Sequence, residues 1–359
     1  GRADLPLHTG RAPRWLFQRM RRLAGEIVSV MVEEFGPAEV LRRLSDPYWF
    51  QAFGCVLGFD WHSSGVTTTA CGALKEGIKG RSSELGLWVA GGKGRTSRKT
   101  PEQIARACEV CGADADRLIY ASRTSAKVDS AALQDGYQIY AHSFFFTDDG
   151  SWAVVQQGMN EGNRLARRYH WLSNDLASFV EEPHRAICSQ RRGENLLLNM
   201  TAAESAGART ASAEAARRDP DKLFGDLEKY LFMPRRHDVR VERDINPAHL
   251  SKVLVSTYER QPRDFEQLLG VRGVGPKTVR ALALIGELIY GEPASSRDPA
   301  RFSFAHGGKD GTPFPVDRQT YDRSIEVLAG CLRRARLEAG DRRSAFGRLD
   351  SLRRSAERF

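Results

Sequence analysis

The residues with the clearest chemical use form a Gly-Val-Gly turn followed by Pro276. The two glycines let the backbone approach an anion closely, and proline suits the first turn of a helix because its missing N–H costs nothing there. The free N–H groups and the dipole at such a helix N-terminus favour a phosphate. The turn therefore predicts a phosphate site at Gly273, Val274, Gly275 and Thr278.

Apolar residues on both sides of the turn predict two helices that pack against each other. They are Leu268, Leu269, Val271, Val274, Val279, Leu282, Ala283 and Leu284. The stretch from Phe265 to Ile285 resembles the helix-hairpin-helix motif, and the resemblance implies a grip on the DNA backbone that reads no sequence. An αα-hairpin with an ordinary glycine turn is the alternative.

This stretch is also similar to the helix-hairpin-helix DNA glycosylases of the endonuclease III-like superfamily. The resemblance implies Lys277 as a nucleophile that attacks C1′ of a flipped nucleotide and forms a Schiff base, with Asp317 aiding the proton transfers. Forty residues separate the two, more than in the compact pattern of that superfamily, and the insertion contains the glycine-rich segment Ser303 to Gly311. In the alternative, Lys277 only contacts phosphate and Asp317 only caps the helix that follows.

A second candidate site consists of amides, imidazoles and carboxylates set in apolar segments of the first half. Buried polar groups cost free energy unless they are paired, so their density predicts a functional pocket. A flipped base is read by such groups and stacked on rings such as Trp61, Tyr169 and Trp171. The candidate base pocket comprises Asp60, His62, Gln134, Asp135, His142, Gln156, Gln157 and His170, with His306 from the later glycine-rich segment.

Two other interpretations of this second site stay open. In one, Asp60, His62, Asp135 and His142 hold a metal ion for hydrolytic nuclease chemistry. In the other, the same polar residues form a hydrogen-bonded network in the core and contact no ligand.

Positive charge is concentrated in two segments. The chain has 54 Lys and Arg against 45 Asp and Glu, a formal net charge of +9. Residues 75–100 carry seven basic and two acidic residues, and residues 330–359 carry nine and four. Local basic segments are typical of proteins that bind a phosphate backbone, so we predict further DNA contacts at Lys93 and Arg95. A solvated helix face is the alternative for the C-terminal segment.

The first 200 residues predict an α+β domain. Apolar residues recur at helical spacing over 14–34 and 38–58, and 85–89 is a short strand candidate. Tyr137 to Phe146 and Trp152 to Gln157 are β-prone and flank an Asp-Gly turn. These two segments predict a β-hairpin within a small sheet.

The remaining chain predicts an all-α domain. Residues 201–218 are rich in Ala, Ser and Arg and poor in bulky apolar residues, so we place a linker there, with an exposed helix as the alternative. Helical patterns dominate 219–340, which carries the helix-hairpin-helix, and 341–359 is predicted to be a basic tail. The predicted helices span 221–232, 247–260, 263–269, 276–290 and 317–337.

Composition and missing motifs exclude several classes of protein. No apolar run is long enough to cross a membrane, and six cysteines without a framework spacing favour a reducing compartment. The glycine-rich segment 91–100 lacks the Lys-Ser/Thr pair of a nucleotide-binding P-loop. We therefore expect a cytoplasmic, nucleoid-associated protein whose partner is DNA and which makes no membrane contact.

Six sequence blocks make the chain similar to the domain-of-unknown-function 763 family over residues 4–335. They are GFDWHSSG, QDGYQ, VVQQGMN, RRYHW, GVGPKT and FAHGGKDG. Together with the hairpin, they lead us to predict a DNA repair glycosylase with AP-lyase activity. It would act on duplex DNA with a lesion or a flipped base, without a cofactor or a bound metal. The alternatives are a metal-dependent nuclease with its site in the N-terminal domain and a non-catalytic DNA-structure binder.

Overall fold

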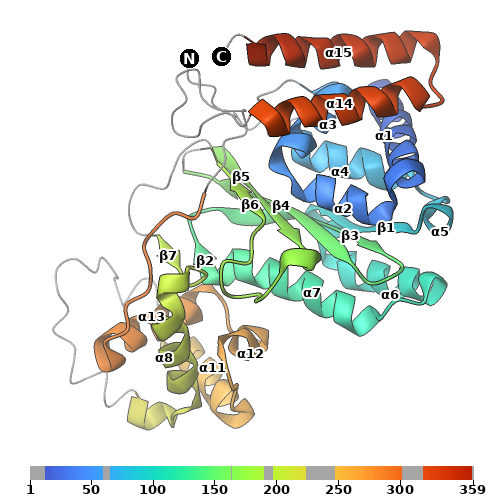
Figure 1. Cartoon of the computed structure of the whole chain (residues 1–359). Helices are drawn as coiled ribbons and strands as arrows, with labels where there is room; N and C mark the ends of the chain where they lie inside the picture. Colours follow the sequence, from blue (N-terminus) through green and yellow to red (C-terminus); the bar gives the residue numbers. More distant parts are fainter. Residues whose placement is uncertain are drawn as a thin grey trace.

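A five-stranded antiparallel sheet, in the order β1-β3-β4-β5-β6, separates two layers of helices (Figure 1). The mixture of helices with a small antiparallel sheet confirms the predicted α+β class. The structure is a computed structural model that describes residues 13–59, 65–162, 164–189, 197–223, 247–300 and 318–357.

The strands form because aromatic and β-branched residues alternate between the two faces of the sheet. Phe145 and Val155 face one layer of helices, whereas Phe144 and Val154 face the other. The strands are β1 Leu87–Lys93, β3 Gln138–Thr147, β4 Trp152–Asn160, β5 Leu165–Leu172 and β6 Ala186–Cys188.

The predicted β-hairpin is confirmed as β3 and β4. Its turn contains Gly150 at a φ of 80°, a left-handed conformation that favours glycine. Asp149 stabilises the turn by accepting hydrogen bonds from the Thr147 hydroxyl at 2.6 Å and from the Ser151 N–H at 2.9 Å. The local turn chemistry thus sets the pairing of the two central strands.

Five N-terminal helices cover one face of the sheet. They are α1 Arg14–Phe35, α2 Pro37–Ser45, α3 Pro47–Leu57, α4 Gly65–Gly77 and α5 Ser82–Leu85. The segment 38–58, predicted to be helical throughout, is broken at Asp46 because Pro47 begins a new helix there. Asp46 caps this helix by accepting hydrogen bonds from the N–H groups of Tyr48 and Trp49.

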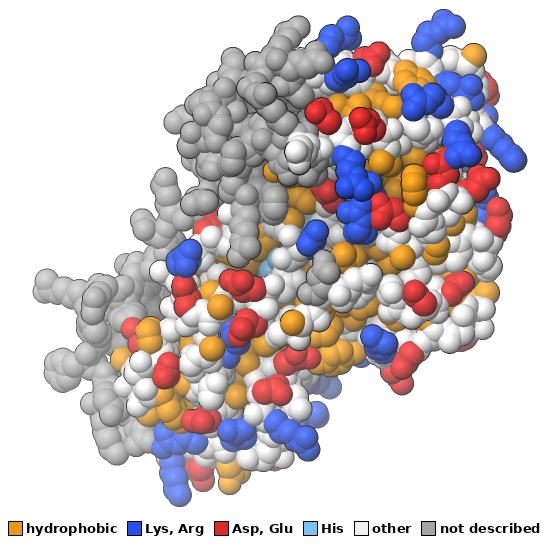
Figure 2. All heavy atoms as spheres, in the orientation of Figure 1, with side chains coloured by type: hydrophobic (Ala, Val, Ile, Leu, Met, Phe, Trp, Pro, Cys, Tyr) orange, Lys and Arg blue, Asp and Glu red, His pale blue; other side chains and the backbone are white. Residues whose placement is uncertain are grey.

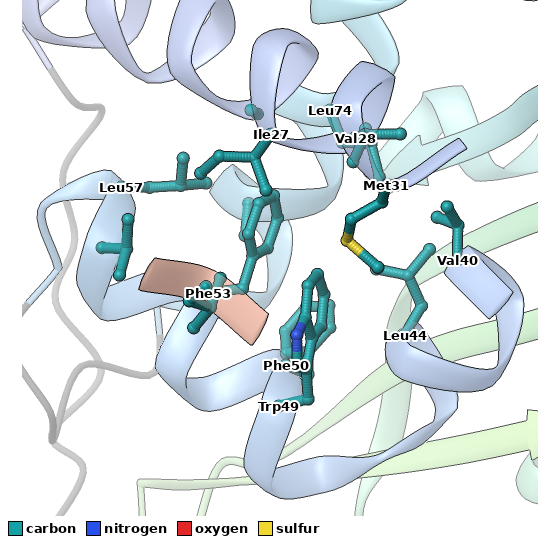
Figure 3. Packing of buried hydrophobic residues seen from close by; sticks show 14 of the residues in the cluster. Ile27, Val28, Met31, Val40, Leu44, Trp49, Phe50, Phe53, Leu57 and Leu74 are labelled. Carbon is teal, nitrogen blue, oxygen red and sulfur yellow. The ribbon is translucent and has the colours of Figure 1, made fainter. Parts of the chain in front are cut away.

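The core of this layer is built from aromatic rings of α3 and aliphatic side chains of α1 and α2. Trp49 and Phe53 stack with their ring centroids 5.0 Å apart. Figure 3 shows Ile27 and Met31 of α1 facing these rings. All four side chains are fully buried, so this cluster ties α1 and α3 to the sheet.

Two C-terminal helices return to the same layer. They are α14 Arg318–Arg334 and α15 Ala339–Glu357, and both pack against α3 (Figure 1). Residues 341–359 were predicted to be a basic tail, and this is wrong for the described residues up to 357. Ala345, Leu349 and Leu352 recur at helical spacing and are buried, so α15 is an amphipathic helix.

The other face of the sheet is covered by α6 Thr100–Cys111 and α7 Ala115–Lys127. Pro101 lies in the first turn of α6, where its missing N–H costs nothing. α7 runs directly into a short π-helix, η2 Val128–Ala132. This π-helix contacts both β3 and α13, so it joins the sheet to the helices that follow.

The helices beyond residue 205 continue this second layer. They are α8 Ala206–Arg217, α11 Pro247–Arg260, α12 Phe265–Gly270 and α13 Pro276–Tyr290. Residues 201–218 were predicted to be a linker, but they contain α8, which packs on α13. Small residues allow this contact, since a Cβ at Gly286 would lie 3.3 Å from the Cβ of Ala211. An alanine-rich helix can therefore be buried without bulky side chains.

Short elements complete the described part of the chain. A two-residue strand β2 Leu133–Gln134 pairs with β7 Leu198–Asn199. The 3₁₀ helices are η1 Gly94–Lys99, η3 Ser173–Asp175 and η4 Ala203–Ser205. Among the described residues, no helix has the length and apolar character needed to span a membrane.

Candidate functional site

The Gly-Val-Gly turn joins α12 to α13 as predicted. Gly273 has a φ of 94°, a left-handed conformation that an L side chain would strain. Gly275 is the N-cap of α13 and has no side chain to cap the helix, and Pro276 is its first residue. The N–H groups of Lys277 and Thr278 therefore lie in a first turn that an anion can cap.

Exposure divides the residues of the turn into two sets. Val274 and Thr278 are buried and pack the turn onto the core, so their side chains are not placed to contact a phosphate. Arg272, Gly273 and Lys277 are exposed. The open side of the turn thus offers two cations beside an uncapped helix N-terminus.

Gln134 connects this turn to the π-helix. Its side-chain amide donates hydrogen bonds to the carbonyl oxygens of Pro276 at 2.8 Å and Ala131 at 3.0 Å. Its carbonyl oxygen accepts a hydrogen bond from Arg280 at 2.9 Å. Gln134 was predicted to line a base pocket, and the structure places it as a bridge that fixes the start of α13.

Replacing Gln134 by alanine removes this bridge. We expect the free energy of unfolding to fall by about 1 to 2 kcal/mol, because the carbonyl of Pro276 and the guanidinium of Arg280 each lose a partner. Hydrogen exchange of the amides in the first turn of α13 should become faster. The control is Gln138→Ala, an exposed glutamine of β3. Equal exchange in the two variants would show that Gln134 does not hold the turn.

A buried carboxylate lies within the π-helix. Asp129 is fully buried and accepts hydrogen bonds from Gln156 at 2.6 Å and from the Trp171 indole at 3.0 Å on one oxygen. Its other oxygen accepts a hydrogen bond from His184 at 2.5 Å. π-Helices are rare and occur frequently at functional sites. Here the π-helix turns a carboxylate toward three donors from β4, β5 and the segment before β6.

His142 and Gln156 extend this network in one direction. The Ser122 hydroxyl donates to His142 Nε2 at 2.8 Å, His142 Nδ1–H donates to Gln156 Oε1 at 2.9 Å, and the Gln156 amide donates to Asp129. In a neutral ring, this order of donors and acceptors corresponds to the Nδ1–H tautomer of His142. Burial lowers the pKa of His142, which agrees with a neutral ring.

Asp135 belongs to a second buried network. It accepts hydrogen bonds from Arg167 at 2.8 Å and from the Tyr169 hydroxyl at 2.7 Å. Arg167 also makes a bidentate ion pair with Asp298, with distances of 3.0 and 2.8 Å. The guanidinium lies 4.6 Å from the ring centroid of Tyr137. This network ties β5 to the segment after α13.

His170 and Gln157 bond to residues outside both networks. Arg168 donates to His170 Nε2 at 2.9 Å, and His170 Nδ1–H donates to the carbonyl of Leu44 at 2.9 Å. The Gln157 amide donates to the Tyr140 hydroxyl at 2.9 Å. The structure therefore brings His142 and Gln156 together, but it distributes the other described members of the predicted base pocket among separate hydrogen-bond networks.

Four of the predicted site residues, Asp60, His62, His306 and Asp317, lie outside the described residues. Within the described residues, no group of three or more His, Cys, Asp or Glu side chains is arranged to hold a metal ion. Asp135 and His142, half of the predicted metal set, bond to Arg167 and to Gln156 respectively.

Sequence reasoning missed several residues of these networks, among them His184 and Asp298. His184 lies 55 positions from its partner Asp129, and Asp298 lies 131 positions from Arg167. Neither belongs to a local motif, so only the folded chain reveals the pairing. A weak signal existed for Asp298, which precedes a proline in a segment of turn-forming residues.

Comparison with known proteins supplies a family and no activity. A family model described as "Protein of unknown function (DUF763)" matches residues 1–316. The chain belongs to this family. The match includes the hairpin turn and both buried networks, and it ends one residue before Asp317. No curated protein and no solved structure matches the chain significantly.

Proposed function

We propose that this member of the DUF763 family binds duplex DNA through the phosphate backbone at the α12–α13 turn. One observation carries the proposal: Arg272 and Lys277 are exposed on either side of Gly273, beside a helix N-terminus without a side-chain cap. Backbone N–H groups, a helix dipole and two cations then favour the same phosphate. This is the contact that a helix-hairpin-helix makes, and α8 with α11–α13 would form its helical domain.

The proposed activity is that of a DNA glycosylase with AP-lyase activity. The Lys277 amine attacks C1′ of a flipped nucleotide, the C1′–N bond breaks, and the base leaves with the bonding electrons and takes up a proton. The amine loses a proton and the sugar ring opens to a Schiff base, from which β-elimination breaks the C3′–O bond. Asp317 is the proposed partner for these proton transfers. The position of Lys277 in the first turn of α13 supports this role, because a phosphate held there brings its own sugar near the amine.

Borohydride trapping tests the activity. Wild-type protein incubated with a duplex that contains an AP site should give a covalent adduct after reduction, and Lys277→Ala should give none. The matched control is Lys252→Ala, which removes an exposed lysine from α11 in the same group of helices. This control should trap as much DNA as the wild type does.

The other outcomes separate the alternatives. An adduct of equal yield in Lys277→Ala would assign the nucleophile to another amine and reject the role of Lys277. Strand cleavage that EDTA abolishes and Lys277→Ala leaves unchanged would indicate a metal-dependent nuclease. Tight, salt-sensitive DNA binding without release of a base or cleavage of a strand would indicate a non-catalytic DNA-structure binder.

A further inference from the structure

A second group of exposed cations lies at the last residue of the edge strand β1 and on η1, which follows it directly. The group consists of Lys93, Arg95, Arg98 and Lys99, all of them exposed. None of the four forms an ion pair with any residue that the structure describes. The basic residues on either side differ, since Arg81 pairs with Glu84 and Arg106 pairs with Glu102. The positive charge of η1 is therefore left for a partner.

Hydrogen bonds with side chains of α4 and α6 hold the backbone that carries these cations. The Gln103 side-chain oxygen accepts hydrogen bonds from the Gly91 N–H at 2.9 Å and from the Lys75 amine at 2.6 Å. Lys75 also donates to the Gly91 carbonyl at 2.7 Å, and the Thr100 hydroxyl donates to the Ser97 carbonyl at 2.6 Å. A basic segment that is ordered before binding loses less conformational entropy when it meets a rigid ligand.

The sequence of β1 fixes where this segment begins. Gly91 has a φ of 87°, and a Cβ at this position would lie 2.2 Å from the carbonyl oxygen of His142 in β3. Only glycine fits so close an approach of the two strands. The end of β1 is thereby pressed against β3, and η1 leaves the sheet from this point.

The beginning of β3 connects η1 to the α12–α13 turn. Lys93, the last residue of β1, pairs with Ala141 near the beginning of β3. Four residues before β3 begins, Gln134 bonds to the carbonyl of Pro276. The π-helix contacts both β3 and α13, and η1 contacts β3. Both unpaired basic elements are thus anchored around the first residues of one strand.

The other basic region, at the C-terminal helices α14 and α15, lies on the other face of the sheet. α14 and α15 pack on the opposite layer, where Arg334 pairs with Glu34, and the acidic Glu338 and Asp341 pair with arginines of α1. Figure 2 shows Lys and Arg side chains interspersed with Asp and Glu side chains over this part of the visible face. The basic residues of α14 and α15 are therefore separated by the sheet from α12 and α13.

We propose that η1 is a second phosphate-binding surface for the duplex that the α12–α13 turn holds, and that α15 is not part of the DNA interface. The proposal rests on the proposed function, because it assigns a further contact to the same ligand. Exposed cations release counterions from DNA when they bind its phosphates. α15 lies on the other face of the sheet from α12 and α13, so its cations are not placed to meet the same duplex. The two elements would contact separate stretches of backbone and fix the orientation of the duplex.

Salt dependence of duplex binding tests this surface. In the η1 variant, Lys93, Arg95, Arg98 and Lys99 are each replaced by glutamine, and affinity is measured by fluorescence anisotropy from about 50 to 200 mM salt. The slope of log K against log salt should become shallower by about 0.9 for each phosphate that the variant no longer neutralises, up to about 3.6 for four. The matched control replaces four exposed arginines of the C-terminal region by glutamine: Arg333, Arg336, Arg343 and Arg354.

The outcomes distinguish failure of this proposal from failure of the proposed function. Equal slopes for the η1 variant and the C-terminal control would overturn the second surface. A Lys277→Gln variant that weakens binding while the η1 variant does not would retain the turn and reject η1. If wild-type protein shows no salt-dependent binding to duplex DNA, both proposals fail. A preference for single-stranded RNA over the duplex would reject the assigned partner.

A variant that keeps every charge tests whether the ordered backbone matters. Gln103→Ala removes the acceptor that holds Gly91 and Lys75, and it leaves all four cations in place. We expect the dissociation constant to rise several-fold while the salt slope stays unchanged, because the same phosphates are still neutralised. Val110→Ala, an uncharged change at an exposed position of the same helix, is the control. A wild-type affinity in Gln103→Ala would show that η1 needs no such support.

Discussion

Asp135→Ala is expected to lower the free energy of unfolding by about 3 to 5 kcal/mol. The guanidinium of Arg167 is fully buried, and Asp135 is one of the two carboxylates that neutralise it. Arginine stays protonated in proteins, so the buried charge cannot be removed by releasing a proton. The variant leaves that charge only partly compensated and also deprives the Tyr169 hydroxyl of its acceptor.

Denaturant unfolding measures this loss. The midpoint should shift while the slope m stays close to the wild-type value, because the same surface is exposed on unfolding. The control is Asp116→Ala, which removes an exposed carboxylate from the first turn of α7 and should cost less than about 1 kcal/mol. Equal losses in the two variants would mean that the Arg167 network does not stabilise the fold.

Most of the secondary structure was predictable because it depends on local chemistry. The helices that begin at Arg14, Pro247 and Pro276 start where the sequence places them, since apolar periodicity and proline act within a few residues. The Asp-Gly turn of the β-hairpin is equally local. The scarcity of bulky apolar residues misled us at α8, where alanines are enough to bury one face of the helix. The basic charge misled us at α15, where a sparse apolar stripe is enough.

The candidate site was predictable only where it is continuous in sequence. The turn from Arg272 to Lys277 depends on adjacent residues, and its glycine conformation and exposed cations follow from them. The polar residues of the first half were found as a dense set, but their partners were not. Arg167 could pair with many carboxylates, and the choice of Asp298 is made by the packing of distant segments. Periodicity carries no information about such pairings.

The segment around the π-helix links the buried polar residues of the sheet to the α12–α13 turn. Asp129 and Gln134 lie at the two ends of the short segment that contains the π-helix, one bonded into the sheet and the other to α13. A shift of this segment would therefore move the start of α13 relative to the sheet. This explains why polar residues are concentrated in the core next to a surface turn, without requiring that they contact a ligand.

Acidification provides a second large effect, since two buried histidines take up protons less readily in the folded protein than in the unfolded chain. Burial lowers the pKa of His142, and burial together with the cation of Arg168 lowers the pKa of His170 well below its usual value. The His170 ring accepts a hydrogen bond from Arg168 on Nε2, so protonation there would set two donors against each other. Around His142, burial outweighs the hydrogen bond with Gln156 and the nearby charge of Asp129, which both favour the protonated ring.

The sign of the effect follows from proton binding. The unfolded chain protonates both histidines below about pH 6.5, whereas the folded state does not until the pH reaches the lower folded-state pKa values. The free energy of unfolding should therefore be nearly constant between about pH 7.5 and 8 and fall as the pH decreases below about 6.5. Each histidine contributes up to about 1.4 kcal/mol per pH unit, or about 2.7 for both. Glu39 and Asp149, whose pKa values are lowered by hydrogen bonds, lose their contribution only below about pH 4.5.

Unfolding by denaturant at several pH values between about 5 and 8 tests this linkage, with His142→Gln and His170→Gln as the informative variants. Each substitution should make the slope of the free energy of unfolding against pH shallower by the contribution of one proton, about 1.4 kcal/mol per pH unit. This change in slope is expected even where the variant itself is less stable. Burial raises the pKa of Asp135, which opposes the decline in the wild type and in both variants alike, so the difference in slope isolates each histidine. If the slopes of all three proteins coincide, the two rings take up protons equally in the folded and unfolded states, and their hydrogen bonds do not enforce neutrality.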